Sequence, residues 1–143
     1  MCGRYTQAAS LQELKERFLA QSAEQTLAAR YNIAPGQSAP VVAGGPGSRR
    51  LELMRWGLIP SWAKDPGIGA KTINARAETA AAKPAFRAAF RHRRCLVPAV
   101  GFYEWRKGAP GEAKQPLRFV LKDRRPFAFA GFEHPVTALH VPA

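Results

Sequence analysis

The chain has 143 residues, of which 46% are hydrophobic, and this size suits one domain with a buried core. Its 22 Lys and Arg against 10 Asp and Glu leave a formal charge of +12, which favours polyanionic partners, nucleic acid first and an anionic membrane second. Twelve Gly and twelve Pro exclude a long-helix bundle, and two Cys exclude a disulfide scaffold or a Cys-rich zinc module.

The first residues lack the apolar segment of a signal peptide, and no apolar run reaches the ~20 residues of a membrane span. Three His and two Cys leave little for a metal site. We therefore expect a cytoplasmic monomer that has no membrane partner and uses neither a metal nor a cofactor.

A short helix is predicted near the start of the chain. Ser10 and Glu13 have the spacing of a capping box, and apolar residues recur at helical spacing after them, so we expect a helix over residues 11–20. Pro35 disfavours a helical conformation at the residue before it, which predicts an extended segment over residues 31–36 that ends in a turn.

The middle of the chain predicts a hairpin, a loop and a second helix. Apolar runs at 40–43 and 50–56 flank a glycine-rich loop, which is typical of two antiparallel strands. Residues 57–69 are rich in Pro and Gly and are expected to form an ordered surface loop. Pro84 suits the first turn of a short helix that continues to about Arg91.

Short strands are predicted in the last third of the chain. Residues 95–97 and 102–105 have strand composition, and 117–121 and 127–130 are expected to pair with each other across the turn at 122–126. We find no internal repeat and no linker. The pattern therefore predicts a single α+β domain that is β-rich, with mostly antiparallel strands and a few flanking helices.

Cys2 would carry two nucleophiles once the initiator Met1 is removed, which a small second residue permits. Its α-amine and its thiol both titrate close enough to neutrality that a fraction of each is reactive. Such a 1,2-aminothiol can attack an aldehyde through the amine and then close a thiazolidine ring through the sulfur. The alternative is a loose terminus with an incidental cysteine.

Two further segments carry candidate polar groups. Asn74 can hydrogen-bond a sugar hydroxyl or a developing oxyanion, and Arg76 can hold a phosphate. Alternatively, Asn74 is the N-cap of a helix, which its spacing favours. Glu104 lies among three aromatic residues, where burial would favour its neutral form and allow proton exchange near pH 7. The alternative is a solvent-facing Glu on an edge strand.

Aromatic and basic residues suggest contacts with nucleic acid. Trp56 and Trp62 bracket a short turn, and an exposed Trp can stack on bases, whereas a buried one fills a core. Residues 87–94 contain a cluster of Arg and His side chains that form either a phosphate-binding track or a solvated face. Cys95 lies in an apolar run and is expected to be an unreactive core residue.

Five short motifs follow one another between residue 2 and about residue 131. They are Met1-Cys2-Gly3-Arg4-Tyr5, Tyr31-Asn32-Ile33-Ala34-Pro35, Arg55-Trp56-Gly57-Leu58-Ile59-Pro60-Ser61-Trp62, Ile73-Asn74-Ala75-Arg76-Ala77-Glu78-Thr79, and Arg94-Cys95-Leu96-Val97-Pro98 followed by Gly101-Phe102-Tyr103-Glu104-Trp105. In this combination the chain resembles the SRAP family (SOS response-associated peptidase), whose members are also called abasic site processing proteins.

The resemblance implies an activity and a set of site residues. Family members use the processed N-terminal Cys to cross-link covalently to abasic sites in single-stranded DNA, as a thiazolidine. Here it implies Cys2 as the nucleophile, with Asn74 and Glu104 as the other catalytic residues, in a partly open barrel with a positively charged DNA channel. The DNA-binding residues that it implies are Arg4 and Arg76 for phosphates, Trp62 for the DNA junction, and Asn32 in a motif near the site with no defined role.

The resemblance also implies a boundary. Residues 1–131 correspond to the family's domain, incomplete on its C-terminal side, and residues 132–143 form a tail that does not match it. The family has a catalytic His in a His-x-Arg-x-Pro-like motif, and His134 and His140 both lack that context, so neither is assigned the role. We therefore expect a C-terminally truncated or frameshifted member of the family.

Three functions remain open at this point. The first is a DNA-damage response protein that traps abasic sites by cross-linking, with lyase-type chemistry. The second is a peptidase, with the Cys2 thiolate attacking a peptide carbonyl, although the sequence offers no positioned His base. The third is an inactive, truncated remnant that only binds DNA.

Overall fold

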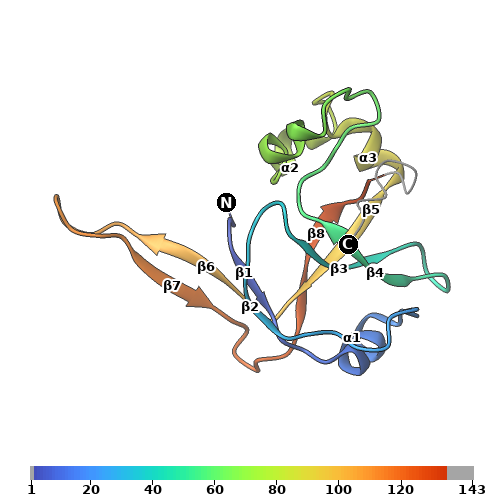
Figure 1. The fold of residues 1–143 in the computed structure, drawn as a ribbon, viewed down its shortest axis with the longest axis horizontal. Helices are drawn as coiled ribbons and strands as arrows, with labels where there is room; N and C mark the ends of the chain where they lie inside the picture. The colour runs from blue at the N-terminus through green and yellow to red at the C-terminus, as the bar shows by residue number, and fades with distance from the viewer. Residues whose placement is uncertain (1, 135–143) are drawn as a thin grey trace.

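A computed structural model gives the fold of residues 2–134 (Figure 1). Its strands form two four-stranded sheets, in the orders β2-β1-β6-β7 and β4-β3-β5-β8, and neighbouring strands are antiparallel. With a few short helices beside them, the expected β-rich α+β class is confirmed, and both sheets are open. The strands are β1 Tyr5–Gln7, β2 Arg30–Ile33, β3 Ser38–Ala43, β4 Arg50–Arg55, β5 Arg94–Ala99, β6 Gly101–Arg106, β7 Gln115–Phe119 and β8 Phe127–Phe132. The helices are α1 Leu11–Phe18, the 3-10 helix η1 Pro66–Lys71, α2 Ala77–Ala80 and α3 Arg87–His92.

Helix α1 forms where the capping pattern predicts it. The Ser10 side chain accepts a hydrogen bond from the backbone N–H of Glu13 at 3.2 Å. The helix ends at Leu19, which adopts a left-handed conformation with φ of 51°. Its buried side chains, Leu14 and Phe18, pack on one face of the second sheet. None of the helices in residues 2–134 is long and apolar enough to cross a membrane.

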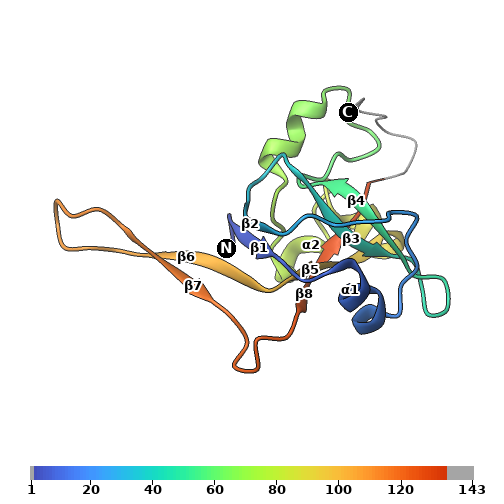
Figure 2. The same cartoon turned by 60° about the horizontal axis from the view of Figure 1, so that its bottom comes forward.

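Residues 94–106 form one long strand that is shared between the sheets. Only Val100 separates β5 from β6, and the β6–β7 hairpin extends away from the body of the molecule (Figure 2). Because β7 pairs with β6 and β8 pairs with β5, the prediction that 117–121 and 127–130 pair with each other is wrong. Instead, β7 pairs with the second half of the long strand in the first sheet, and β8 pairs with its first half in the second sheet.

Other local predictions were met in part. The hairpin of β3 and β4 is confirmed. The expected loop at 57–69 runs into η1, where the Asp65 side chain accepts a hydrogen bond from the N–H of Gly67 at 2.8 Å. Helix α3 begins later than Pro84, because the residues before it form a turn. Residues 135–143, which include His140 and most of the expected tail, lie outside the described residues.

The two faces of the second sheet have different neighbours. Directly paired residues share a face, as Val97 and Phe129 do across β5 and β8. These two pack against a core cluster of Tyr5, Ile33, Ala39 and Ala99 that joins the two sheets, whereas α1 covers the opposite face. The inner face of this sheet therefore looks toward the first sheet and the start of the chain.

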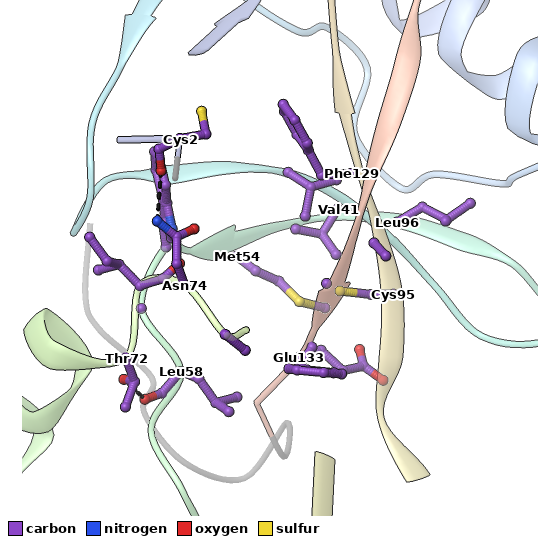
Figure 3. A pocket seen from close by; sticks show the side chains of 18 of the residues that line it. Cys2, Val41, Met54, Leu58, Thr72, Asn74, Cys95, Leu96, Phe129 and Glu133 are labelled. Atoms are coloured by element: carbon purple, nitrogen blue, oxygen red, sulfur yellow. Dashed lines mark hydrogen bonds between the residues drawn. The ribbon is translucent and has the colours of Figure 1, made fainter. Parts of the chain in front are cut away.

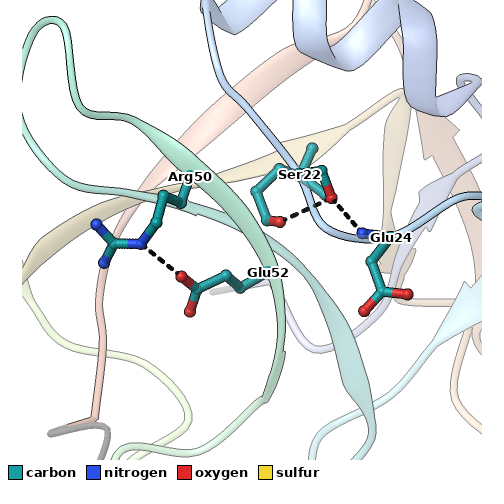
Figure 4. A network of polar contacts seen from close by, with 5 residues as sticks. Ser22, Glu24, Arg50 and Glu52 are labelled. Carbon is teal, nitrogen blue, oxygen red and sulfur yellow. Dashed lines mark hydrogen bonds and ion pairs between the residues drawn. The ribbon is translucent and has the colours of Figure 1, made fainter.

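The segment after α1 is fixed along the edge strand β4 (Figure 4). The N–H of Leu51 donates to the carbonyl of Gln21 at 2.7 Å, and the Ser22 hydroxyl donates to the carbonyl of Leu51 at 3.1 Å. On the same strand, Arg50 and Glu52 form an exposed ion pair at 2.7 Å, which adds little stability. These contacts cover one edge of the second sheet and lead the chain toward β2.

Candidate active site

A cavity of about 790 Å³ is lined by Cys2, Asn74 and Glu104, the three residues expected to be catalytic. Figure 3 shows Cys2 and Asn74 at this cavity. They come from the segment before β1, the segment before α2, and β6. Most of the remaining wall is apolar, contributed by the strands of the second sheet and by α2 and α3. The fold thus brings distant polar groups together at one side of an otherwise apolar hollow.

Cys2 is held in place by its neighbours. The side-chain amide of Asn74 donates a hydrogen bond to the Cys2 carbonyl at 2.7 Å, and the Cys2 thiol donates to the carbonyl of Arg4 at 3.3 Å. The Cys2 sulfur lies on the side away from Asn74 (Figure 3). Cys2 is also half-buried, so it is not a loose terminus.

The segment that carries Asn74 is fixed from the other side. The indole N–H of Trp56 donates to the carbonyl of Ile73 at 2.7 Å, and the Thr72 hydroxyl donates to the carbonyl of Leu58. The interpretation of Asn74 as a helix N-cap is wrong, because its amide bonds to Cys2 and the N-cap of α2 is Arg76.

One close backbone approach makes this arrangement possible. Gly57 has φ of +132°, and a Cβ there would lie 2.5 Å from the carbonyl oxygen of Gly69. A residue with a side chain would be strained and would clash, so only glycine suits this position.

Electrostatics keep the Cys2 sulfur neutral. Burial raises the pKa of the Cys2 thiol above its ordinary value, and the negative charge of Glu104 raises it further. The thiol therefore stays protonated near neutral pH, while a carboxylate stands close enough to influence it.

Arg4 and Asn32 form a second polar group beside the site. The Arg4 guanidinium donates to the side-chain oxygen of Asn32 at 2.9 Å, and the N–H of Tyr103 donates to the Arg4 carbonyl at 2.9 Å. Asn32, for which the sequence suggested no role, therefore orients the Arg4 head group.

Two other predicted DNA-binding residues lie outside the cavity wall. Arg76 is exposed at the start of α2, and Trp62 is 57% exposed. The indole N–H of Trp62 lies 3.4 Å from the carbonyl oxygen of Pro84, to which it donates. The structure thus brings Cys2, Asn74 and Glu104 to one cavity. Arg4 and Asn32 pair with each other outside its wall, and Arg76 and Trp62 lie on the surface.

Sequence reasoning missed Tyr5 and assigned no role to His134, and both line the cavity. Tyr5 is 3% exposed, but all three residues of β1 are buried, so no alternation pattern revealed its direction. His134 accepts a hydrogen bond at Nδ1 from the N–H of Ile59 at 2.8 Å. Within residues 2–134, no group of three His, Cys, Asp or Glu side chains is placed to hold a metal ion.

Cys95 lines the same cavity, and its buried thiol favours the neutral form. It is buried on β5, and burial raises the pKa of its thiol to about 12. Such a thiol is almost entirely protonated near neutral pH. The prediction that Cys95 is a core residue is confirmed, and its low reactivity stays a prediction.

Fold and site together define a small basic α+β domain with a fixed cysteine at residue 2. The family model for SOS response associated peptidase (SRAP) matches residues 1–139, and the chain belongs to this family.

Several relatives and solved structures resemble the chain. It is 44% identical over 133 residues to abasic site processing protein YoqW from Bacillus subtilis, covering 92% of this chain and 59% of the relative. It is 32% identical over 136 residues to abasic site processing protein YedK from Escherichia coli, covering 91% and 58%. A crystal structure of a protein from Bacteroides thetaiotaomicron superposes with a TM-score of 0.78 at 27% identity, covering 92% of this chain and 59% of that one. The chain therefore spans a little under three fifths of the length of these proteins.

Proposed function

We propose that this protein binds single-stranded DNA and cross-links covalently, through Cys2, to an abasic site. The observation that carries the proposal is the hydrogen bond from Asn74 to the Cys2 carbonyl, which holds the residue with both nucleophiles at the cavity. The names of the relatives, abasic site processing proteins, point to the same substrate.

The chemistry starts when an aminopeptidase hydrolyses the Met1–Cys2 peptide bond and frees the Cys2 amine. The amine attacks the aldehyde carbon of the ring-opened abasic sugar, and a proton passes from nitrogen to oxygen. Loss of water from this adduct gives an imine. The thiol then adds across the C=N bond, sulfur to carbon and hydrogen to nitrogen, which closes the thiazolidine. The cross-linking steps release one water in total and need no oxidant or reductant.

Side chains around the cavity suit these steps. Because the thiol stays protonated, the amine acts first and the sulfur acts only on the imine. Glu104 would pass a proton from the amine to the departing hydroxyl, and later carry the thiol proton to the ring nitrogen as the sulfur adds. Asn74 would keep the amine and sulfur of Cys2 aimed at one carbon atom.

A basic surface would hold the DNA strand beside the cavity. Arg4, oriented by Asn32, and Arg76 would bind phosphates, and the exposed Trp62 would stack on a base at the junction. The formal charge of +12 would draw the strand in from a distance.

The peptidase alternative has weaker support. A thiol peptidase attacks with a thiolate, and here both burial and Glu104 oppose thiolate formation. An aldehyde needs only the amine for the first bond. The site therefore favours the aldehyde of an abasic site over a peptide carbonyl.

The test uses the full chain and a single-stranded oligonucleotide with one abasic site. We expect a band shift that survives denaturant, and an intact mass that equals the chain without Met1 plus the oligonucleotide minus one water. Cys2→Ala should lose the adduct, and the matched variant Cys95→Ala should keep it. An adduct at full yield in Cys2→Ala would refute the assignment of Cys2. Reversible, salt-sensitive binding alone would favour a protein that only binds DNA.

A further inference from the structure

The hydroxyl of Tyr5 is buried and has no hydrogen-bond partner within residues 2–134. The ring itself is fixed, edge to face, by Trp56 at 5.4 Å and by Phe129 at 6.1 Å between centroids. A buried hydroxyl without a partner lowers stability, and a phenylalanine would fill the same space without that cost. The hydroxyl therefore calls for a reason other than packing.

Cys2 is a reactive group that shares the cavity wall with Tyr5. Cys2 packs against the core cluster to which Tyr5 belongs, and both residues line the cavity. The charge of a Cys2 thiolate is one cause that raises the pKa of Tyr5, after burial, while Arg30 lowers it. Tyr5 therefore stays protonated, so its hydroxyl can donate.

The hydrogen bond that the Cys2 sulfur makes in the structure is possible only for the neutral thiol. The S–H group donates to the carbonyl oxygen of Arg4, and a thiolate would be repelled by that oxygen. When the sulfur gives up its proton, a hydrogen-bond donor stabilises it and this carbonyl does not. The unpartnered Tyr5 hydroxyl is a donor that the protein already holds in place beside Cys2.

We propose that the Tyr5 hydroxyl is the hydrogen-bond donor that receives the Cys2 sulfur as the thiol is deprotonated, and so positions it for ring closure. Tyr5 keeps its own proton throughout, and the thiol proton leaves to Glu104 or to water. Tyr5 is thus a positioning residue that acts through Cys2, and its role in ring closure rests on the proposed function. The charged groups of the described residues that face this pair are Glu104 on β6 and Arg30 on β2.

The first experiment measures alkylation of Cys2 by iodoacetamide against pH in the full chain, with the modified residue located by mass spectrometry. Tyr5→Phe should move the profile to higher pH and slow alkylation at pH 8 about tenfold, because the thiolate loses a donor. Its Tm should be unchanged or higher. The matched control is Tyr103→Phe, which removes a hydroxyl that donates to the Tyr31 carbonyl at 3.1 Å, and it should leave the profile unchanged. A Tyr5→Phe profile that superimposes on the wild type, or a shifted profile with a fall in Tm, overturns the proposal.

The second experiment uses the oligonucleotide with one abasic site and borohydride, which reduces an imine but not a thiazolidine. Tyr5→Phe should accumulate more borohydride-trapped adduct than the wild type, because the amine step is intact and ring closure is slowed. An equal trapped fraction in the two chains overturns the role in ring closure. A wild-type chain that forms no adduct refutes the proposed function and this role with it, while the alkylation profile still decides whether Tyr5 contacts the sulfur.

Discussion

The side-chain amide of Asn74 donates a hydrogen bond to the backbone carbonyl of Cys2 over 2.7 Å, although 72 positions separate the two residues in the sequence. A carbonyl fixed in this way also fixes the Cα of Cys2, which carries both the amine and the side chain. A five-membered ring closes only if these two groups reach the same carbon atom, so in the proposed reaction the orientation of residue 2 would control ring closure.

Replacement of Asn74 should therefore slow cross-linking without weakening DNA binding. We expect Asn74→Ala to reduce the single-turnover rate roughly 10- to 100-fold, because residue 2 loses its fixed orientation. Asn74→Asp should be slower still, since a carboxylate would repel the Cys2 carbonyl. The rate is measured on the abasic oligonucleotide, and affinity on an oligonucleotide with a tetrahydrofuran in place of the sugar. A large loss of affinity would show that Asn74 instead binds the DNA strand.

Arg4 and Asn32 should behave as one unit in DNA binding, because Asn32 orients the guanidinium. Arg4→Ala should weaken binding to all single strands alike and lower the salt slope by about one unit. Asn32→Ala should have a smaller effect, and none in an Arg4→Ala background. Arg76→Ala, at a separate position, should add its own loss to that of Arg4→Ala. Full additivity of Asn32→Ala and Arg4→Ala in fluorescence titrations would refute the coupling.

The elements that depend on neighbouring residues could be predicted from the sequence. The side chain of Ser10 and the glycine-rich turn between β3 and β4 act within a few residues, so the helix and the hairpin could be predicted. The strands that pair with β7 and β8 could not be predicted in this way. Their pairing depends on the long strand of residues 94–106, whose change of sheet at Val100 has no distinct sequence signal.

In the candidate site too, some residues could be predicted from the sequence and others could not. Cys2, Asn74 and Glu104 could be singled out from chemistry. The resemblance to a family added Arg4 and Asn32. The hydrogen bond to the Cys2 carbonyl is long-range, so spacing alone favoured a helix cap for Asn74 instead. Tyr5 stayed unnoticed because a missing hydrogen-bond partner is visible only once the residues around the hydroxyl are placed.

Gly57 should be needed for stability and for the position of Asn74. Gly57→Ala would force a side chain into a backbone with φ of +132° and set its Cβ 2.5 Å from the Gly69 oxygen. We expect the free energy of unfolding to fall by about 3 kcal/mol. Gly45→Ala is the matched control, since a Cβ there meets nothing within 4 Å, and its change should stay within about 0.5 kcal/mol. Urea unfolding of the two variants checks this, and equal stabilities would contradict it.

Glu104 gives a prediction in which two rates move in opposite directions. Burial and then the Glu104 charge raise the pKa of the Cys2 thiol, so Glu104→Gln removes one cause and should lower that pKa. At a fixed pH below the thiol pKa, more sulfur is then ionised, and alkylation of Cys2 by iodoacetamide should become faster. Cross-linking should become slower, on the order of 10²-fold, because no carboxylate remains to move protons between thiol, amine and departing hydroxyl.

The pair of measurements separates two roles that Glu104 could have. If Glu104 acted only by holding a charge near the sulfur, a more ionised thiol would close the ring faster, and both rates would rise together. If it moves protons, alkylation rises while cross-linking falls. Affinity for the tetrahydrofuran oligonucleotide should change little, which keeps a binding defect from imitating the result. Cross-linking at the wild-type rate at every pH would show that Glu104 has no part in the chemistry, and the aminothiol would then react with the aldehyde unaided.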